Sequence, residues 1–269
     1  AGDPPAPFSG QVWYNDSSSS LKYSFVNPGS WSTGGDLNLG RRVLAGSGTQ
    51  TAALAFGGFA PSAPGVSATT EAYNGSSWTE VNDLNTARQR HGGDGTSTSS
   101  LAWAGKTNAD VAIAELWNGT NWTEVNDLNT ARSYISGSGD SNTAGLAFGG
   151  DPVKVETESY NGTNWTELNN LNLGRHALGG CGSNTAALAF GGQPGSAQKL
   201  ETELWNGTNW TEVNNLNVNH PETAGAGTST SALCFGKDLV AETWNGTNWT
   251  VVANMSSPRA VPGGAGANN

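Results

Sequence analysis

The feature of this sequence that most constrains its fold is a repeat. The run from Asn74 to Arg88 aligns with similar runs that end at Arg132 and Arg175. One tryptophan of each unit falls at position 78, 122, 165, 210 or 249, with a more distant relative at 31, so successive spacings are 47, 44, 43, 45 and 39 residues. Periods of about 40 to 50 residues are typical of propellers when the units are made of strands, and of solenoids when they are helical. The repeat length therefore leaves two fold classes.

The local sequence of each unit favours β-strands. A short apolar run ends in paired glycines, as in residues 54–58, and an alternating stretch such as residues 203–213 follows it. Frequent glycine destabilises helices, whereas Asn-Gly between aromatic and β-branched residues is a strong signal for a tight hairpin. We therefore expect four short strands in each unit, which in the fourth unit cover residues 175–183, 185–190, 202–205 and 210–214.

Together the units predict an all-β fold, a six-bladed β-propeller of four-stranded blades that forms a single domain over residues 1–269. Complete blades are expected at about residues 41–87, 88–131, 132–174, 175–218 and 219–258. The C-terminal piece 259–269 matches only a first strand, and residues 8–40 supply candidates for the other three, at 11–14, 21–25 and 31–33. A split sixth blade built from these pieces would close the ring without an exposed sheet edge. A five-bladed ring with an unrelated N-terminal arm is the alternative.

The repeated motif resembles the kelch motif of β-propellers over nearly the whole chain. The resemblance rests on the paired glycines after the second strand, the aromatic residue in the third strand and the Trp in the fourth. Two units depart from it, since Gly105-Lys106 and Gly236-Lys237 keep only one glycine, and the linker reads Asp-Leu-Asn-Thr-Ala. Separately, residues 10–15 followed by Leu21-Lys22-Tyr23 resemble a short β module of phage virion and tail proteins, and the low-charge repeats are similar to that group too.

Composition narrows the classes of function. The 269 residues include 12 Lys and Arg against 22 Asp and Glu, and the net charge of −10 at pH 7 repels phosphate backbones and anionic lipid. No window approaches the ~18 consecutive apolar residues of a membrane span. We therefore expect no nucleic-acid partner and no membrane span. Because residue 1 is not Met, we expect a removed leader, a trimmed initiator or a cut from a longer chain.

The two cysteines predict neither a disulfide nor a zinc site. Cys181 and Cys234 lie 53 residues apart and form no CxxC spacing. They fall in a first and a second strand, at unrelated positions of their units, so nothing brings their Cβ atoms to within the ~4 Å that a disulfide requires. Both are expected to be free and buried.

The Asn-Gly turn fixes the register of the hairpin between the third and fourth strands. Trp205 then faces Trp210, and on the same face Glu203 faces Glu212. The same count pairs Glu71 with Glu80, Glu115 with Glu124, and Glu158 with Glu167. One interpretation is a hard-cation site, with Glu115, Glu124, Glu203 and Glu212 as its candidates. We favour a hydrated pair at the outer rim, with a basic side chain as a candidate bridge, because two carboxylates alone make a poor Ca²⁺ site, and we predict no metal.

Other repeated residues are interpreted as structural. The Asn-Gly-Thr-Asn-Trp-Thr element contains overlapping glycosylation sequons, but Asn and Gly also suit the positive φ of a turn, which we favour. The aromatic pairs offer faces for sugar rings, yet packing between blades is favoured because each pair contributes a large buried area. A recurrent Arg is expected to bond carbonyls or a carboxylate at a blade end, at positions 41, 88, 132, 175 and 259.

The sequence offers no pattern of catalytic residues. His91 and His176 occur only in blades two and four, and neither has a second His or Cys nearby. We find no Ser-His-Asp order, nucleotide-binding loop or HExxH pattern. The galactose-oxidase branch of kelch propellers implies Tyr, His and Cys ligands around copper, and this chain has no such cluster. We expect no enzymatic activity, no catalytic residue and no cofactor.

The leading functional hypothesis is a non-enzymatic binding or structural module of a phage virion or tail, with an extracellular or virion location. Its partner would be another virion or surface protein, or a host-surface ligand such as a glycan. The alternative is a secreted bacterial lectin or adhesin that binds glycans. The connection between strands two and three differs most between units, so we predict that the partner contacts this rim near Phe59, Lys154 and Lys199. The rim of near-identical Asn-Gly turns is expected to be neutral.

Overall fold

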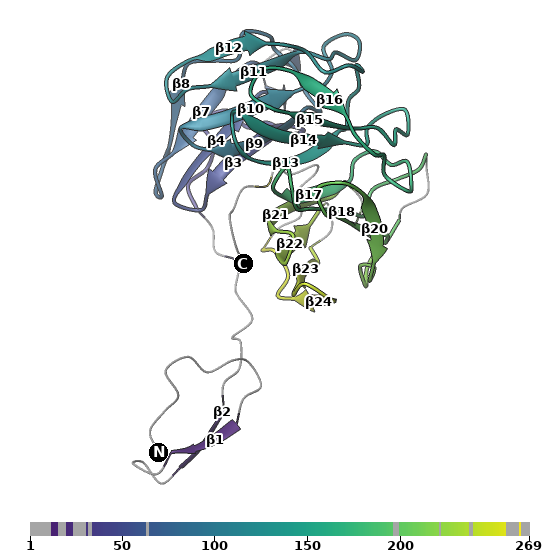
Figure 1. Ribbon diagram of the computed structural model, residues 1–269. Helices are drawn as coiled ribbons and strands as arrows, with labels where there is room; N and C mark the ends of the chain where they lie inside the picture. Colours follow the sequence, from purple (N-terminus) through teal and green to yellow (C-terminus); the bar gives the residue numbers. More distant parts are fainter. Residues whose placement is uncertain are drawn as a thin grey trace.

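Five four-stranded antiparallel sheets form the blades of a β-propeller (Figure 1). The computed structural model describes residues 12–15, 20–23, 31, 34–62, 65–195, 199–220, 222–236, 239–256 and 264. Within each of these sheets neighbouring strands follow chain order, so every blade is a simple meander. The predictions of an all-β propeller and of four-stranded blades are confirmed.

Each blade takes its first to fourth strands in the order of the chain. Blade one consists of β3 (Ala45–Thr49), β4 (Ala52–Phe56), β7 (Thr70–Tyr73) and β8 (Trp78–Val81), and blade two of β9 (Gly92–Thr96), β10 (Ser99–Trp103), β11 (Ala114–Trp117) and β12 (Trp122–Val125). Blade three consists of β13 (Ser136–Ser141), β14 (Ala144–Phe148), β15 (Thr157–Tyr160) and β16 (Trp165–Glu167). Blade four consists of β17 (Gly179–Gly182), β18 (Ala187–Phe190), β19 (Thr202–Trp205) and β20 (Trp210–Val213), and blade five of β21 (Ala224–Thr228), β22 (Ser231–Phe235), β23 (Ala241–Trp244) and β24 (Trp249–Val252).

The first strand of blade four is shorter than predicted. The sequence predicts a strand from residue 175, whereas β17 begins at Gly179. The preceding Ala177 has a φ of +52°, a left-handed conformation that interrupts the extended backbone before Gly179. The third strand, predicted over residues 202–205, has those bounds in β19.

The structure describes five blades and not the six that were predicted. The N-terminal strands β1 (Val12–Asn15) and β2 (Ser20–Tyr23) pair only with each other and form a two-stranded sheet of their own. Figure 1 shows this hairpin standing away from the blades, at the end of the molecule marked N. The residues expected to supply the first strand of the sixth blade, 259–263 and 265–269, lie outside the described residues.

Glycine in the first strands lets neighbouring blades approach closely at the centre. The first strands of consecutive blades contact one another from β3 to β9, β13, β17 and β21. A Cβ placed on Gly93 would lie 2.6 Å from the ring of Phe56 and 3.1 Å from Cβ of Ala45, both in blade one. Any larger residue at Gly93 would push the first two blades apart.

Away from the centre, tryptophans fill the space between blades. Trp122 of blade two packs on Phe56 of blade one, with ring centroids 4.9 Å apart, and its Nε1 donates to Oγ1 of Thr70 at 3.0 Å. Trp210 and Trp249 repeat both contacts between later pairs of blades. Because these rings are only about 5% exposed, they act as packing groups, as expected.

The Asn-Gly turns join neighbouring blades at the circumference. In blade two, Oδ1 of Asn118 accepts hydrogen bonds from the backbone N–H groups of Thr120 and Asn121, which closes the turn. Asn82 of blade one donates its Nδ2 to Oδ1 of Asn121 at 2.8 Å. The same link recurs from Asn126 to Asn164, Asn169 to Asn209 and Asn214 to Asn248. The sequon asparagines therefore have structural roles, which agrees with their interpretation as turn residues.

Two residues from the ends of the chain lie against blade five. Trp31 packs on Phe235 with ring centroids 5.5 Å apart, and its Nε1 donates to the carbonyl of Ala253 at 3.0 Å. Gly264 lies between the first strands of blades five and one, since a Cβ on it would fall 2.1 Å from the carbonyl oxygen of Gly225. A Cβ on Gly46 would in turn lie 3.4 Å from the carbonyl oxygen of Gly264.

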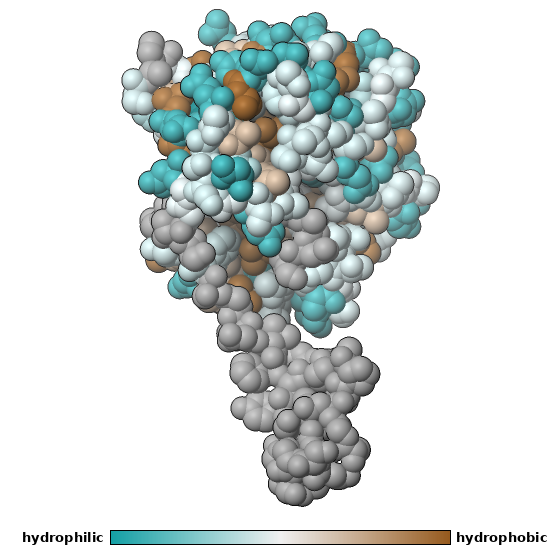
Figure 2. Space-filling view, turned by 90° about the vertical axis from the view of Figure 1, so that its left-hand side faces the viewer, coloured by the Kyte–Doolittle hydropathy of each residue, from teal (hydrophilic) through white to brown (hydrophobic). Residues whose placement is uncertain are grey.

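The surface of the propeller is polar with scattered apolar residues. On the face that Figure 2 shows, hydrophobic residues are interspersed among hydrophilic ones and form no large continuous patch. The large hydrophobic residues that are exposed among those described are Val153, Leu239 and Val251. The described part of the chain contains no helix long and apolar enough to cross a membrane.

Candidate binding surface

The loops that differ most between units share one end of the blades with the linkers that carry the recurrent Arg. In an antiparallel meander alternate connections lie at the same end, so the connection between strands two and three lies beside the linker into strand one. Backbone pairing joins the two segments within a blade, from Arg42 to Phe59 in blade one and from His176 to Gln193 in blade four. We call this end of the propeller, with its loops and linkers, the variable rim.

The three predicted partner residues all lie in the loops of the variable rim. Phe59 belongs to the short strand β5 (Phe59–Ala60), which pairs with β6 (Gly65–Val66), and the Arg42 guanidinium lies 5.2 Å from the centre of its ring. Lys154 forms an ion pair with Glu156 at 3.2 Å, and Lys199 forms one with Glu201 at 3.5 Å. The two lysines occupy adjacent blades, whereas Phe59 belongs to blade one, so the three do not form a single cluster.

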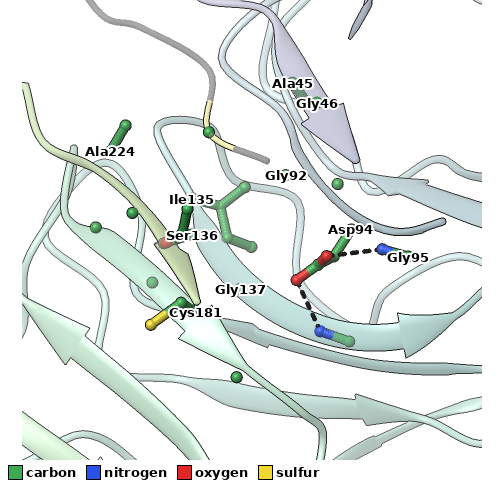
Figure 3. A pocket seen from close by; sticks show the side chains of 18 of the residues that line it. Ala45, Gly46, Gly92, Asp94, Gly95, Ile135, Ser136, Gly137, Cys181 and Ala224 are labelled. Carbon is green, nitrogen blue, oxygen red and sulfur yellow. Dashed lines mark hydrogen bonds between the residues drawn. The ribbon is translucent and has the colours of Figure 1, made fainter. Parts of the chain in front are cut away.

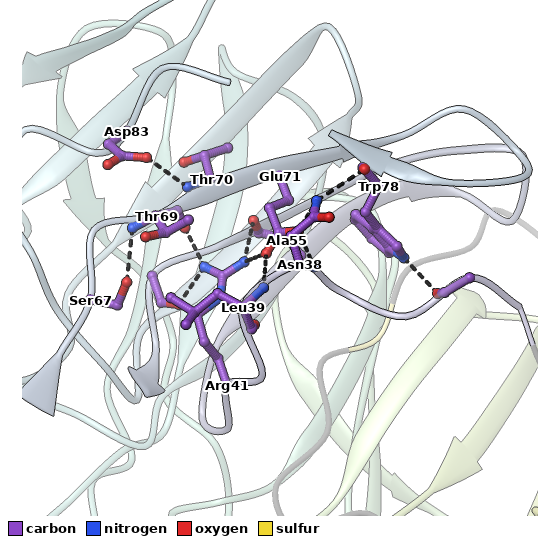
Figure 4. A network of polar contacts seen from close by, with 12 residues as sticks. Asn38, Leu39, Arg41, Ala55, Ser67, Thr69, Thr70, Glu71, Trp78 and Asp83 are labelled. Carbon is purple, nitrogen blue, oxygen red and sulfur yellow. Dashed lines mark hydrogen bonds and ion pairs between the residues drawn. The ribbon is translucent and has the colours of Figure 1, made fainter. Parts of the chain in front are cut away.

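A buried network anchors the base of the variable loop in blade one (Figure 4). In blade one the Arg41 Nη2 lies 2.8 Å from Oε1 of Glu71, and its Nη1 donates to the carbonyls of Gly57 and Thr69. Asn38 donates its backbone N–H and its Nδ2 to Oε2 of Glu71 at 2.7 and 2.9 Å. Equivalent ion pairs join Arg88 to Glu115 at 2.8 Å, Arg132 to Glu158 at 3.2 Å and Arg175 to Glu203 at 2.8 Å. The expected structural role is confirmed for these four arginines, while Arg259 lies outside the described residues.

The predicted register of the glutamates is confirmed, but their environment differs from the expectation. Glu115 faces Glu124, as the Asn-Gly turn requires, and Glu203 faces Glu212. The third-strand members are buried, whereas the fourth-strand members are exposed, so the interpretation as a hydrated pair is wrong for the inner carboxylates. The four metal candidates therefore divide into two carboxylates already paired with Arg and Asn and two that face solvent. No group of three or more His, Cys, Asp or Glu in the described residues could hold a metal ion.

Blade five replaces the Arg of the network with histidine. Nε2 of His220 lies 3.1 Å from Oε1 of the buried Glu242, and Asn217 donates to the other carboxylate oxygen. Burial raises the pKa of Glu242, but the hydrogen bonds from His220 and Asn217 outweigh it, so this pKa lies below its ordinary value. The network of blade five therefore depends on an ionised carboxylate.

A cavity of about 530 Å³ extends between the first strands of the five blades (Figure 3). Asp94 lies in its wall, and its carboxylate accepts the backbone N–H groups of Gly95 at 2.7 Å and Gly139 at 2.9 Å. The second bond reaches blade three at the point where the pairing of β13 shifts register between Gly139 and Ser141. Burial raises the pKa of Asp94 to about 7. The Asp94 carboxylate therefore links blades two and three at the irregular part of the pairing between β13 and β14.

Neither cysteine forms a disulfide and both are buried, as predicted. Cys181 lies in the wall of the cavity, and its Sγ is 3.6 Å from the carbonyl oxygen of Thr228 in blade five. Burial, together with the nearby charge of Asp94, raises the pKa of the Cys181 thiol. A thiol with a raised pKa is a poor nucleophile, so its position in the cavity gives it no reactive character.

Five residues of the variable rim share the left-handed conformation, and four of them, Val43, Arg90, Tyr134 and Ala177, line the cavity. The residue two positions after the recurrent Arg, or after His220 in blade five, has a φ between +48° and +57° in every blade. The backbone N–H of Arg90 donates to the carbonyl of Val43 at 2.9 Å, that of Tyr134 to Arg90 at 2.8 Å, and that of Ala177 to Tyr134 at 3.0 Å. We call this ring the channel mouth; its residues are Val43, Arg90, Tyr134, Ala177 and Glu222.

The side chains of the channel mouth differ in every blade, although the backbone is the same. A left-handed conformation costs roughly 1 to 2 kcal/mol for a residue with a Cβ, and glycine would avoid that cost. Sequence reasoning missed this ring because none of its residues is a turn-former. Aligning the units would have revealed it, since five different residue types follow the recurrent Arg, or His220 in its place, at a fixed spacing.

The two histidines singled out from the sequence lie near the channel mouth. His91 follows Arg90 and packs against Phe56, with ring centroids 5.7 Å apart. Burial and the positive charge of Arg88 lower the pKa of His91 well below its ordinary value, so its imidazole is neutral at pH 7. The ring of His176 lies 5.8 Å from that of Tyr134. The two side chains belong to different blades and have different partners, so they do not form a joint site.

A comparison with models of known protein families and a comparison with curated protein sequences found no match to this chain.

Proposed function

We propose that this protein is a non-enzymatic binding module that presents its variable rim and channel mouth to a partner. The observation that carries the proposal is the contrast between the two parts of each unit. The buried Arg, Glu and Asn and the circumferential Asn links recur from blade to blade, whereas loops and mouth residues change. The residues that stabilise the ring are the same in successive blades. The residues that vary are therefore available to bind a partner.

We place the module on a phage virion or tail, with an extracellular or virion location. The support is the resemblance of the N-terminal segment to a β module of such proteins and the low content of charged residues, with a net charge of −10. The kelch resemblance is supported by the paired glycines: Gly57 and Gly58 have φ values of +63° and +103°, conformations that side chains rarely adopt.

We further propose that the ring has six positions and that the ends of the chain fill the sixth. Gly264 packs against blade five in the way that blade five packs against blade four. A Cβ on Gly264 would lie 2.1 Å from the carbonyl oxygen of Gly225, and a Cβ on Gly225 would lie 2.8 Å from that of Gly180. Trp31 packs on Phe235 much as Trp249 packs on Phe190, with centroids 5.5 and 4.9 Å apart. Both contacts are those expected of a sixth blade following blade five.

A lectin or adhesin is the second candidate, with its sugar site at the channel mouth and not at the aromatic pairs. The pairs between strands three and four have little face left for a sugar, since Trp205 and Trp210 are 1% and 5% exposed. The channel mouth, by contrast, opens to a cavity lined partly by Tyr134 and by backbone polar groups. Cavities of roughly 300 to 1,000 Å³ are typical of small-ligand sites.

The experiment that tests the proposal exchanges loops between blades. The short connection of blade five replaces those of blades one and four, and the labelled protein is applied to a glycan array and to purified virions. We expect the exchange to abolish binding while the melting temperature stays within a few degrees of the parent.

The matched control changes the turns at the circumference, with Thr120→Ala, Thr163→Ala and Thr208→Ala. These three threonines are exposed turn residues, so the fold should tolerate the loss of their side chains. Binding that survives the loop exchange but is lost in the turn variants would place the site away from the variable rim and refute the proposal.

A further inference from the structure

The channel mouth carries side chains at positions where glycine could form the same backbone hydrogen bonds. Hydrogen bonds between main-chain groups hold the ring from Val43 to Ala177, so no side chain is needed to form it. The left-handed φ values favour glycine, yet the chain places a β-branched, a basic, an aromatic and an acidic residue there. Strain that is retained at one site, in every blade and with different side chains, points to a role for those side chains beyond folding.

Two arginines of the variable rim lack an anion among the described residues: Arg90, which lines the cavity, and the exposed Arg42. Nine Lys and Arg side chains are described, and seven of them form an ion pair with Asp or Glu; the seven are Arg41, Arg88, Lys106, Arg132, Lys154, Arg175 and Lys199. The other two are Arg42 and Arg90, which have no carboxylate within 4 Å in the described part of the chain. In a protein with net charge −10, two such cations at one place are a distinctive feature.

These two arginines lie on neighbouring blades and each is supported by an aromatic ring. The Arg90 guanidinium lies 4.3 Å from the centre of the Tyr134 ring, and that of Arg42 lies 5.2 Å from the centre of the Phe59 ring. Val43, next to Arg42, accepts the backbone N–H of Arg90 at 2.9 Å, so the backbones of the two arginines are close at the mouth. Nε of Arg90 is buried and has no hydrogen-bond partner among the described residues. Stacking on a ring holds a guanidinium in place while its edge stays free to bind.

The surroundings of Arg90 favour an anion over a cation. The neighbouring His91 is neutral at pH 7. The cavity is also lined by Asp94 of β9, whose carboxylate accepts the backbone N–H groups of Gly95 and Gly139, and by Asp140 of β13. Glu222 takes the equivalent position in blade five, three blades along the ring from Arg90. A planar guanidinium with free N–H groups matches the geometry of a carboxylate, sulfate or phosphate.

We propose that the channel mouth binds a small ligand through an oxyanion group, with Arg90 as its principal contact, Arg42 as a second cation and Tyr134 as the ring that orients Arg90. This inference rests on the proposed function and names the ligand chemistry for that site. An acidic sugar is one source of the oxyanion, and free sulfate or phosphate is another. The remainder of the ligand would enter the cavity behind the mouth.

The test measures binding by isothermal titration calorimetry at constant ionic strength, with four probes: glucuronate, galactose 6-sulfate, inorganic phosphate and neutral galactose. We expect at least one of the first three to bind and galactose to bind at least tenfold more weakly. Preference for the two acidic sugars over phosphate would identify a saccharide as the source, whereas equal binding of phosphate would identify the free anion. Absence of binding by all three anions at millimolar concentration would overturn the proposal.

Variants separate this site from general charge effects. Arg90→Gln should weaken binding at least tenfold, whereas Lys106→Gln, which removes one positive charge from the same blade and breaks only the ion pair with Asp110, should change it less than twofold. Arg90→Gly relieves the left-handed backbone, so it should abolish binding without lowering the melting temperature, which excludes unfolding as the cause. Equal losses in Arg90→Gln and Lys106→Gln, or unchanged binding in Arg90→Gly, would refute the assignment. The loop exchange between blades removes Phe59 beside Arg42 but leaves Arg90 and Tyr134 in place, so loss of partner binding after the exchange with anion binding retained would separate the two proposals.

Discussion

At the scale of single residues, the stability of the propeller depends on charges that are buried and paired. Glu115 accepts Arg88 and both donors of Asn85, and both ionic side chains are fully buried. Removing one member of such a pair leaves an uncompensated charge in the interior, which costs more than the pair itself contributes. The exposed Glu124, directly opposite on the neighbouring strand, carries the same charge without that dependence.

The pair Glu115 and Glu124 therefore gives a matched prediction. Glu115→Gln should lower the free energy of unfolding by about 3 to 5 kcal/mol, because Arg88 loses its anion. Glu124→Gln should change it by less than about 0.5 kcal/mol, as surface substitutions do. Urea denaturation followed by tryptophan fluorescence measures both. Similar values for the two variants would mean that the network contributes little.

The raised pKa of Asp94 should make the stability of the protein depend on pH. Its pKa in the folded protein is raised to about 7, above the value near 4 of an unfolded chain. Folded and unfolded states are both protonated below about pH 4, and between about pH 4 and 7 the unfolded state ionises first, so stability falls as pH rises and the loss is complete above about pH 7. Relative to Asp94→Asn, the wild type should lose roughly 1 to 3 kcal/mol between about pH 4 and pH 8. Parallel stability curves would contradict this.

At the scale of the strands, close contact at the centre depends on residues without a side chain. The first strands of neighbouring blades approach so closely that Gly93 leaves no room for a Cβ beside Phe56. A Cβ on Gly40, in the linker before blade one, would by contrast have nothing within 4 Å. Composition counts these two glycines alike, but only one of them sets the distance between blades.

Replacing each glycine with alanine tests this distinction. Gly93→Ala should lower the free energy of unfolding by about 1 to 3 kcal/mol or more, since the buried Phe56 ring must move. Gly40→Ala should be within about 0.5 kcal/mol of the wild type. Thermal unfolding followed by circular dichroism would show the difference, and a neutral Gly93→Ala would mean that the blades can separate without loss of stability.

The strands are also where sequence reasoning succeeds and where it fails. The Asn-Gly turn fixes the register of the two strands that it joins. The pairing of Trp205 with Trp210 could therefore be predicted from local sequence alone. The recurrent Arg was expected to bond carbonyls or a carboxylate, but the identity of its partner could not be predicted, because the pair Arg88 and Glu115 joins a linker to a third strand. Aligning the units marks the channel mouth as a variable position, but its left-handed conformation could not be predicted. Tyr134 bonds through its backbone to neighbouring blades, and its local sequence carries no sign of this.

At the scale of the whole molecule, the closure of the ring decides whether the first and last blades are protected. Gly264 lies between the first strands of blades five and one, at the place where a sixth first strand would stand. An unpaired sheet or an open seam exposes backbone groups and buried side chains to association with other chains.

Deletion of residues 258–269 should therefore destabilise the protein markedly or cause it to aggregate. Substitution of Gly264 by valine is a smaller change that tests the same contact. Its Cβ would lie 2.1 Å from the carbonyl oxygen of Gly225, so the segment must shift. We expect both variants to lower the melting temperature, the deletion more than the substitution. A deletion variant with the melting temperature and monodispersity of the parent, measured by calorimetry and light scattering, would contradict ring closure by the C-terminal segment.

The main-chain ring at the channel mouth has a consequence for how such a protein can change over time. Because the hydrogen bonds from Val43 to Ala177 use only peptide groups, each mouth side chain can be exchanged without disturbing its neighbours' backbone. The flanking repeats are similar enough for recombination between them to move a whole blade, together with its mouth residue, to another position. A new combination of five side chains would then arise in one genetic event, on a scaffold whose own contacts are unchanged.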